Sequence, residues 1–340
     1  MKLSIAVRAA FCISFWLGCA GPGKAQTAQE FYKGKTLRFI VGYGPGGGYD
    51  LYARLVAEFL PKFLPGNPQS VVQNMPGGGS FVAAKYLYDV AAKDGTYFGS
   101  LAQTLALDSA VDPESKLDVS RFAYIGRATS NIDLGVASKK SGIASFEDVR
   151  KTAYSVGASG GGSTTVVFPS ALNMYGGAKF KLVRGYAGTT EIQLAMERGE
   201  VDIIGAYGLP GMITSQPGWI EGRDATLIYQ ASVKRHKLLS TVPTLPELAQ
   251  DDFGREILHA VASTGDFGRS ILTTPGVPPE RLAALRKAFQ NMLKNPEFRA
   301  ASEARNLMID QASGEEMDEL ARQTTRLSSA TRPKIAELMK

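Results

Sequence analysis

The stretch VGYGPGGGYDLYARLVAEFL, residues 41–60, decides the fold because an apolar run passes through a glycine-rich loop into a helical pattern. Residues 37–41 form the apolar run, which is typical of a buried strand. From Leu51 onward apolar residues recur at helical spacing until Pro61, which marks the end of the helix. The same succession returns 31 residues later in VVQNMPGGGSFVAAKYLYDV, residues 71–90. Two strands, each followed by Pro-Gly-Gly-Gly and a helix, are therefore predicted in series.

The alternation of strand and helix signals continues along the chain and predicts the α/β class. A third strand is expected at 97–101, and a second series of elements begins near residue 131. The strands and helices of the second series are expected at 134–137, 154–157, 164–175, 180–183, 191–198, 201–205 and 227–230. A β-α-β-α-β order implies mostly parallel sheets flanked by helices. Two α/β units of similar size, followed by helices that begin at Pro278-Pro279-Glu280, are the simplest arrangement.

Length and composition fit an exported, two-domain globular protein. The chain has 340 residues, of which 44% are hydrophobic and 21% are charged, as is ordinary for a folded protein. Lys2 and Arg8 precede an apolar stretch at 9–20, and Gly23-Lys24-Ala25 offers a small-x-small ending. We expect residues 1–25 to be a secretory signal cleaved after Ala25, which implies a periplasmic protein.

Cysteine usage and charge narrow the chemistry. Cys12 and Cys19 both lie in the predicted signal, so no disulfide, thiolate metal site or cysteine nucleophile is expected in the mature chain. Leu17-Gly18-Cys19 resembles part of a lipoprotein-processing box, and a lipidated form stays an alternative. Cleavage after Ala25 would remove three basic residues and no acid, lowering the formal charge from +6 to +3. This balance implies no nucleic acid or other polyanionic partner.

The two Pro-Gly-Gly-Gly loops are predicted to bind an anion. In an open α/β sheet, ligands bind beyond the carboxyl ends of the strands, where each loop leads into a helix. Unpaired N–H groups at a helix start hold an anion without side-chain cations, and glycine lets the backbone approach closely. A third loop, VGASGGGSTTVVF at 156–168, would face the first two from the second unit. The candidate ligand-binding residues are Tyr43, Gly46, Gly47, Gly48, Tyr49, Asp50, Gly77, Gly78, Gly79, Ser80, Gln103, Ser159, Gly161, Ser163, Thr164 and Tyr207.

Each candidate also has a structural interpretation. A single glycine-rich turn commonly serves as a tight connection, although two in register favour a site. Asp50 falls in the first turn of a helix, where an acid complements the helix dipole, so its side chain is interpreted as shaping the loop. The aromatic residues are individually expected to pack against neighbours. His236 and His259 show no metal spacing, and no metal or other cofactor is expected.

Two enzyme motifs offer competing hypotheses. Gly42–Gly47 satisfies G-x-G-x-x-G, but the next strand ends in Gln73-Asn74, where a dinucleotide site needs an acid. Gly157-Ala158-Ser159-Gly160-Gly161 satisfies the G-x-S-x-G nucleophile elbow, and acids and histidines follow it in order. No His-Gly-Gly-Gly segment precedes it to form an oxyanion hole. A secreted serine hydrolase that uses Ser159 is the alternative to a non-enzymatic receptor.

The sequence resembles the Bug family, the periplasmic solute-binding proteins of tripartite tricarboxylate transporters. The resemblance rests on FYKGKTLRFIVGYGPGGGYDLYARLVAEFL, VVQNMPGGGSFVAAKYLYDVAAKDGTYFGSL, TVPTLPEL, TTPGVPPERLAALRKAF and LKNPEFRA, which follow one another along nearly the whole mature chain. It implies a type II Venus-flytrap fold, in which 26–130 and 260–340 form one domain and 131–259 form the other. It also implies a monomer that captures a small organic carboxylate between the domains and delivers it to membrane permease subunits or to a sensor.

The resemblance implies roles for the glycine loops, and one residue departs from the family pattern. Positions 43–50 and 76–80 would hold a ligand carboxylate through backbone groups and ordered water, and 159–165 would contact the rest of the ligand. Tyr49 stands where many members carry a small hydroxyl residue, so its phenol would narrow the pocket or stack on the ligand. Citrate-like ligands are therefore in doubt, and smaller dicarboxylates or aromatic carboxylates fit as well.

Overall fold

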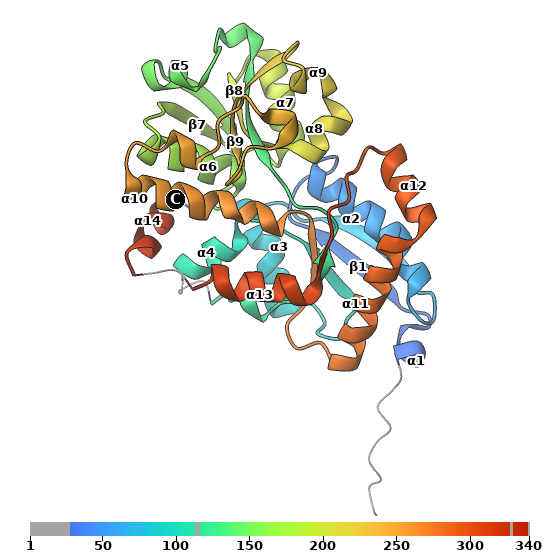
Figure 1. The fold of residues 1–340 in the computed structure, drawn as a ribbon. Coiled ribbons are helices and arrows are strands. Elements are labelled where there is room, and N and C mark those ends of the chain that lie inside the picture. The colour runs from blue at the N-terminus through green and yellow to red at the C-terminus, as the bar shows by residue number, and fades with distance from the viewer. Residues whose placement is uncertain (1–27, 113–115, 327–328, 339–340) are drawn as a thin grey trace, which may run out of the picture.

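The computed structural model describes residues 28–112, 116–326 and 329–338, and these form two lobes joined by crossing segments (Figure 1). The predicted signal at 1–25 lies outside the described residues. The lower lobe in Figure 1 contains a six-stranded sheet, and the upper lobe contains a five-stranded sheet. Two α/β sheets flanked by helices confirm the predicted fold class.

The two sheets share one strand order. The first sheet runs β2 (Gln69–Asn74), β1 (Thr36–Val41), β3 (Tyr97–Ser100), β10 (Ser270–Thr273), β4 (Ala123–Arg127) and β11 (Ala312–Ser313). The second sheet runs β7 (Phe180–Arg184), β6 (Tyr154–Ala158), β8 (Ile203–Gly208), β5 (Asp133–Ser138) and β9 (Ala225–Ala231). Each sheet therefore places a strand that has just crossed from the other lobe, β10 or β5, in fourth position.

The sheets are mixed, not mostly parallel as the sequence predicts. The βαβ portions are parallel, since β1 pairs with β2 and β3 in parallel and β6 does so with β7 and β8. β10 and β5 are antiparallel to both of their neighbours. The reason is topological, because a strand that enters from the other lobe starts at the edge where the parallel strands end.

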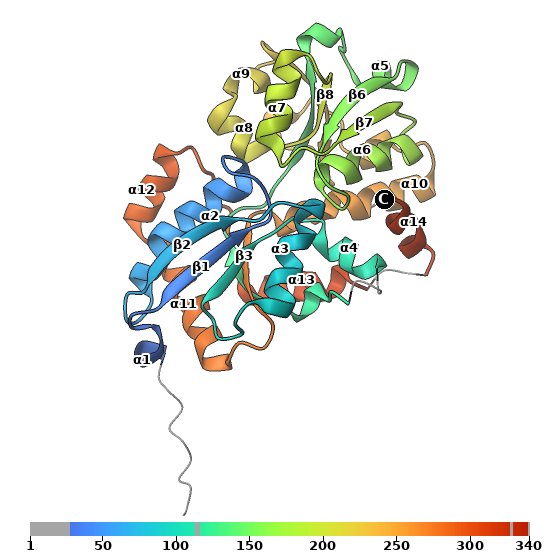
Figure 2. The same ribbon diagram turned by 180° about the vertical axis from the view of Figure 1, so that it is seen from behind.

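Helices cover both faces of each sheet (Figures 1 and 2). In the first lobe they are α1 (Ala28–Tyr32), α2 (Gly48–Phe59), α3 (Phe81–Lys85), α4 (Leu105–Val111), α11 (Pro279–Lys294), α12 (Pro296–Ala304) and α13 (Gly314–Thr324). In the second lobe they are α5 (Phe146–Lys151), α6 (Thr164–Tyr175), α7 (Thr189–Arg198), α8 (Leu209–Ser215), α9 (Pro217–Ile220) and α10 (Asp252–Ala262). The apolar face of α2 packs into the first-lobe core with Tyr52, Leu55 and Val56, as its sequence spacing predicts.

The last helix, α14 (Thr331–Leu338), lies between the lobes. It contacts α4 of the first lobe and both α6 and α10 of the second lobe, as Figure 2 also shows. Its Ile335 and Leu338 belong to the same apolar cluster as Leu107 of α4 and Phe168 of α6. The predicted domain boundaries, 26–130 with 260–340 and 131–259, stay predictions.

The two crossing segments run side by side and are hydrogen-bonded to each other. The Ala128 N–H donates to the Arg269 carbonyl at 3.1 Å, and the Arg269 N–H donates to the Thr129 carbonyl at 2.8 Å. Further along, the Asn131 N–H donates to the Gly265 carbonyl at 2.9 Å. Residues 128–131 and 265–269 therefore form a two-stranded connection, which we call the crossing pair.

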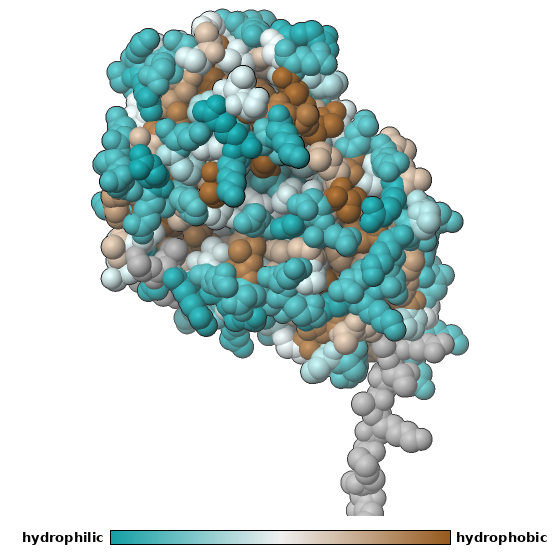
Figure 3. Space-filling model, viewed as in Figure 1, coloured by the Kyte–Doolittle hydropathy of each residue, from teal (hydrophilic) through white to brown (hydrophobic). Residues whose placement is uncertain are grey.

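The outer surface is largely hydrophilic on the face shown in Figure 3, with hydrophobic residues in separate small groups. Within the described ranges, no helix combines the length and apolar character needed to cross a bilayer.

Candidate functional site

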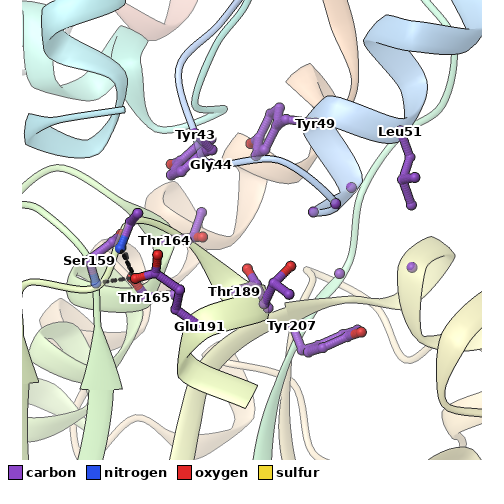
Figure 4. A pocket seen from close by; sticks show the side chains of 18 of the residues that line it. Tyr43, Gly44, Tyr49, Leu51, Ser159, Thr164, Thr165, Thr189, Glu191 and Tyr207 are labelled. Atoms are coloured by element: carbon purple, nitrogen blue, oxygen red, sulfur yellow. Dashed lines mark hydrogen bonds between the residues drawn. The ribbon is translucent and has the colours of Figure 1, made fainter. Parts of the chain in front are cut away.

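A cavity lies between the two lobes, at the edge where the parallel strands of both sheets end (Figure 4). It encloses about 1110 Å³ of space not filled by protein atoms, part of which is open to solvent. The first turns of three helices line it, namely residues 46–49 at α2, 163–165 at α6 and 188–191 at α7. Helix N-termini expose unpaired N–H groups and carry a partial positive charge, so all three favour an anion in this cavity.

The first glycine loop is held in shape by Asp50. Its carboxylate is 2% exposed and accepts hydrogen bonds from Gly46 N–H at 2.9 Å, Arg54 Nε at 2.8 Å and Asn74 Nδ2 at 2.8 Å. Burial alone would raise the pKa of Asp50, but these hydrogen bonds together hold its pKa below the ordinary value. Gly46, with φ at +84°, adopts the left-handed conformation that this loop requires. Asp50 is not among the cavity-lining residues, and its contacts agree with the loop-shaping interpretation.

Two tyrosines of the same loop form the first-lobe wall. The rings of Tyr43 and Tyr49 stack with centroids 4.8 Å apart and planes at 22°. The Tyr49 hydroxyl accepts a hydrogen bond from the Gln103 N–H at 2.9 Å. Burial raises the pKa of Tyr49 to about 12, so its phenol is neutral at physiological pH.

The second-lobe wall is rich in hydroxyl groups. Thr165 Oγ1 accepts from the Ser159 N–H at 2.9 Å and lies 3.0 Å from Ser159 Oγ and 2.8 Å from Ser163 Oγ. Figure 4 shows Ser159 and Thr165 side by side in this wall. Thr164, Thr189 and Tyr207 also line the cavity. Hydroxyl groups can both donate to and accept from a ligand, so this wall suits a polar molecule.

Three charged residues line the cavity, Arg269, Asp133 and Glu191, and none of them was predicted from the sequence as a site residue. Glu191 lies in the first turn of α7 and accepts a hydrogen bond from the Ala187 N–H at 2.8 Å, whereas Arg269 and Asp133 are each 4% exposed. Arg269 Nη2 donates to Asn131 Oδ1 at 3.0 Å, Asn131 Nδ2 donates to Gln103 Oε1 at 3.0 Å, and Gln103 Nε2 donates to Asp133 Oδ2 at 3.1 Å. Burial raises the pKa of Asp133, while the charge of Arg269 opposes that rise. No local motif marks either residue, because Arg269 reaches the cavity only through the crossing pair.

The structure brings nine of the predicted residues to this cavity. They are Tyr43, Gly46, Gly47, Gly48, Tyr49, Ser159, Ser163, Thr164 and Tyr207. Gly77, Gly78 and Gly79 instead line an adjoining cavity, which shares Tyr43, Ser159 and Ala187 with the first. Asp50, Ser80, Gln103 and Gly161 line neither cavity. Ser80 is fully buried and its Oγ accepts from the Ala102 N–H at 3.1 Å, while Gln103 belongs to the amide network above.

The second glycine loop differs from its prediction because it forms a contact between the lobes. Gly77, Gly78, Gly79 and Ser80 all have positive φ, so no regular helix start follows Pro76. A Cβ on Gly79 would lie 2.5 Å from Ser163 N and would also overlap the Gly161 carbonyl. The glycines therefore allow backbone-to-backbone contact with the loop of α6, while the predicted ligand-binding role of this loop stays a prediction.

The geometry also bears on the competing enzyme hypotheses. Ser159 Oγ is hydrogen-bonded to the Thr165 hydroxyl, and a threonine hydroxyl does not act as a general base. His236 instead accepts from the Leu238 N–H at 3.3 Å through Nδ1. Among the described residues, no group of three or more histidines, cysteines and acids is arranged to hold a metal ion.

This arrangement of two lobes, a crossing pair and a cavity between them is similar to the fold of two-domain solute-binding proteins, and comparisons with known proteins agree on the fold. No family model matches the chain. A curated relative, the UPF0065 protein in gbd 5'region of Cupriavidus necator, is 24% identical over 285 residues, which cover 81% of this chain and 80% of that protein.

Two solved structures are similar in fold. MatC from Rhodopseudomonas palustris with bound malate has a TM-score of 0.69 and 18% identity, covering 90% of this chain and 99% of that one. The periplasmic binding protein BugD has a TM-score of 0.67 and 19% identity, covering 90% of this chain and 97% of that one. The resemblance to Bug-type solute-binding proteins is thus confirmed at the level of the fold.

Proposed function

We propose that this protein is an extracytoplasmic receptor that captures a small organic carboxylate between its two lobes. The observation that carries the proposal is the convergence of the N-terminal turns of α2, α6 and α7 on one cavity. Each turn contributes backbone donors and about half a positive charge, and a carboxylate placed among them interacts favourably with all three, although Glu191 in the first turn of α7 offsets part of that helix's dipole. The malate named with MatC supports the same ligand class for this chain.

The binding step is closure of the lobes about the crossing pair. Residues 128–131 and 265–269 form the hinge in this proposal, and their mutual hydrogen bonds keep the two crossings together as they bend. Closure removes water from the cavity and strengthens each hydrogen bond to the anion. Gly46–Gly48 and Tyr49 contact the ligand from the first lobe, and Ser159, Ser163, Thr164 and Tyr207 contact it from the second.

The partner in this proposal is a tripartite tricarboxylate-type permease, which takes the ligand from the closed receptor, or a membrane sensor. The fold shared with BugD and the predicted signal at 1–25 support export to the periplasm. A monomer is sufficient, because both walls of the cavity come from one chain.

A graded substitution at Gly47 tests the proposal. Gly47 lines the cavity, has φ of −80° and has no atom within 4 Å of the position of a Cβ, so a side chain enters the cavity without strain on the fold. In calorimetric titrations with mono-, di- and tricarboxylates, we expect one or more to bind the wild type. Gly47→Phe should abolish that binding, and Gly47→Ala, the control, should keep it.

Two other results would contradict the proposed receptor function. Equal affinities of Gly47→Phe and the wild type would mean that the ligand binds elsewhere. Turnover of an ester that disappears in Ser159→Ala would instead support the hydrolase alternative.

A further inference from the structure

Arg269 is the one arginine or lysine among the described residues that line the cavity. Its side chain is 4% exposed and its guanidinium lies 4.1 Å from the centroid of the Tyr49 ring. Nη2 donates to Asn131, but Nε and Nη1 have no hydrogen-bond partner in the part of the chain that the structure describes. A buried charged donor without a partner is costly, so its presence at the wall of a ligand cavity indicates that an acceptor arrives with the ligand.

The surroundings keep this guanidinium in place. Tyr49 lies against it, and the Asn131 hydrogen bond fixes one edge. A Cβ on Gly48 would lie 3.2 Å from both Nε and Nη2, so glycine at the start of α2 leaves room for the guanidinium beside the helix N-terminus. A guanidinium held in this way suits a carboxylate, which can accept a hydrogen bond from Nη1 or Nε, or two parallel hydrogen bonds from either of these together with the second N–H of Nη2.

Asp133 supplies a second recognition group close by. A Cβ on Gly208 would lie 2.6 Å from Arg269 Nη2 and 3.5 Å from Asp133 Oδ1. Both charged groups therefore lie close to Gly208, which also lines the cavity. They are joined only through Asn131 and Gln103 in the hydrogen bonds above. A cation and a carboxyl group so placed match a ligand that carries a carboxylate and, close to it, a hydrogen-bond donor.

We propose that Arg269 binds the ligand carboxylate directly and that Asp133 accepts a hydrogen bond from a hydroxyl or ammonium group of the same ligand. The ligand class is then a 2-hydroxy or 2-amino carboxylate. This inference rests on the proposed receptor function, which requires a carboxylate in the cavity but no side-chain cation.

The test is titration calorimetry of the full mature chain with three probes that share one carbon skeleton, namely malate, aspartate and succinate. We expect malate or aspartate to bind the wild type at least about 10-fold more tightly than succinate, which lacks the donor. Arg269→Met keeps the length and packing of the side chain and should weaken binding at least about 30-fold. Asp133→Ala should remove the preference over succinate, and Asp133→Asn should weaken aspartate more than malate.

The matched control is Arg281→Met. Arg281 is also a partly buried arginine stacked on an aromatic ring, with its guanidinium 3.6 Å from the Phe31 ring centroid, but it lies outside the cavity. Its removal should leave the affinities within about 2-fold of the wild type, while thermal unfolding reports any general loss of stability.

The outcomes separate the two proposals. A wild type that binds a carboxylate whose affinity is unchanged in Arg269→Met overturns the role of Arg269 and leaves the receptor function standing. Equal affinity for malate, aspartate and succinate overturns the role of Asp133. Failure of the wild type to bind any carboxylate in the wider panel overturns the receptor function and this inference with it.

Discussion

Substitution of Gly79 by alanine should weaken ligand binding by blocking closure of the lobes, without touching the main cavity. Gly79 has φ of +61°, and a Cβ there would lie 2.5 Å from Ser163 N in the opposite lobe and overlap the Gly161 carbonyl. The left-handed conformation costs an alanine about 1–2 kcal/mol whether the lobes are open or closed. The overlap exists only when they are closed, and overpacking of this kind costs about 1–3 kcal/mol. Only the second cost enters the dissociation constant, which should rise roughly 5- to 150-fold.

Calorimetric titration with the best-binding carboxylate measures this effect, and Gly142→Ala is its control. Gly142 has φ of +73° and no atom within 4 Å of its Cβ position, so its substitution carries the conformational cost alone. Both variants should lose about 1–2 kcal/mol of unfolding free energy, whereas Gly79→Ala alone should lose affinity. Identical dissociation constants for Gly79→Ala and Gly142→Ala would refute the idea that this glycine contact is part of the closed state.

Two further predictions concern the dependence of stability on pH. Because the pKa of Asp50 is lower in the folded chain, its contribution to stability is present above the unfolded pKa of about 4 and is lost as pH falls through the folded value. Asp50→Asn should therefore lower the unfolding free energy by about 1–3 kcal/mol at pH 7, with the difference shrinking below pH 4 in urea titrations. Burial, and then the charge of Asp112, raise the pKa of Asp108 to about 6, so the contribution of Asp108 to stability falls as pH rises from about 4 to about 6. Asp108→Asn should be more stable than the wild type at pH 7.5 and equal to it below about pH 4; a stability difference between the two that does not grow as pH rises over that interval would contradict the assignment.

The parts of this fold that depend on local spacing could be predicted from the sequence. The strand at 37–41 and the helix from Leu51 follow from short-range periodicity, and the structure has both. The orientation of β10 and β5 could not be predicted, because it depends on where the chain crosses between lobes and not on the composition of either strand. A helix follows the second Pro-Gly-Gly-Gly loop as predicted, over Phe81–Lys85 and Tyr86–Val90, but local spacing did not show that the glycines of this loop make room for the backbone of the opposite lobe.

In the candidate site too, some residues could be predicted from local sequence spacing, whereas others depend on contacts between distant parts of the chain. The residues of the first loop follow directly from their strand and helix, and all of the predicted ones except Asp50 line the cavity. Arg269 could not be found in this way, because it is separated from Tyr49 by most of the chain and meets it only where the crossing pair enters the first lobe. One signal in the sequence does point toward it: Tyr49 replaces the small residue typical of the family pattern, and its ring is the surface on which the guanidinium lies.

The position of Arg269 also links ligand binding to the movement of the lobes. Its backbone is hydrogen-bonded to residues 128 and 129 in the crossing pair, while its side chain faces the cavity. Closure without a ligand buries two unpaired guanidinium nitrogens, and closure around a carboxylate satisfies them. The helix N-termini attract an anion in both states, because their dipoles stay with their own lobes. The arginine therefore adds what the dipoles lack, because it makes the free-energy difference between the open and closed states depend on the anion. A ligand shifts a conformational equilibrium only when it interacts differently with the two states.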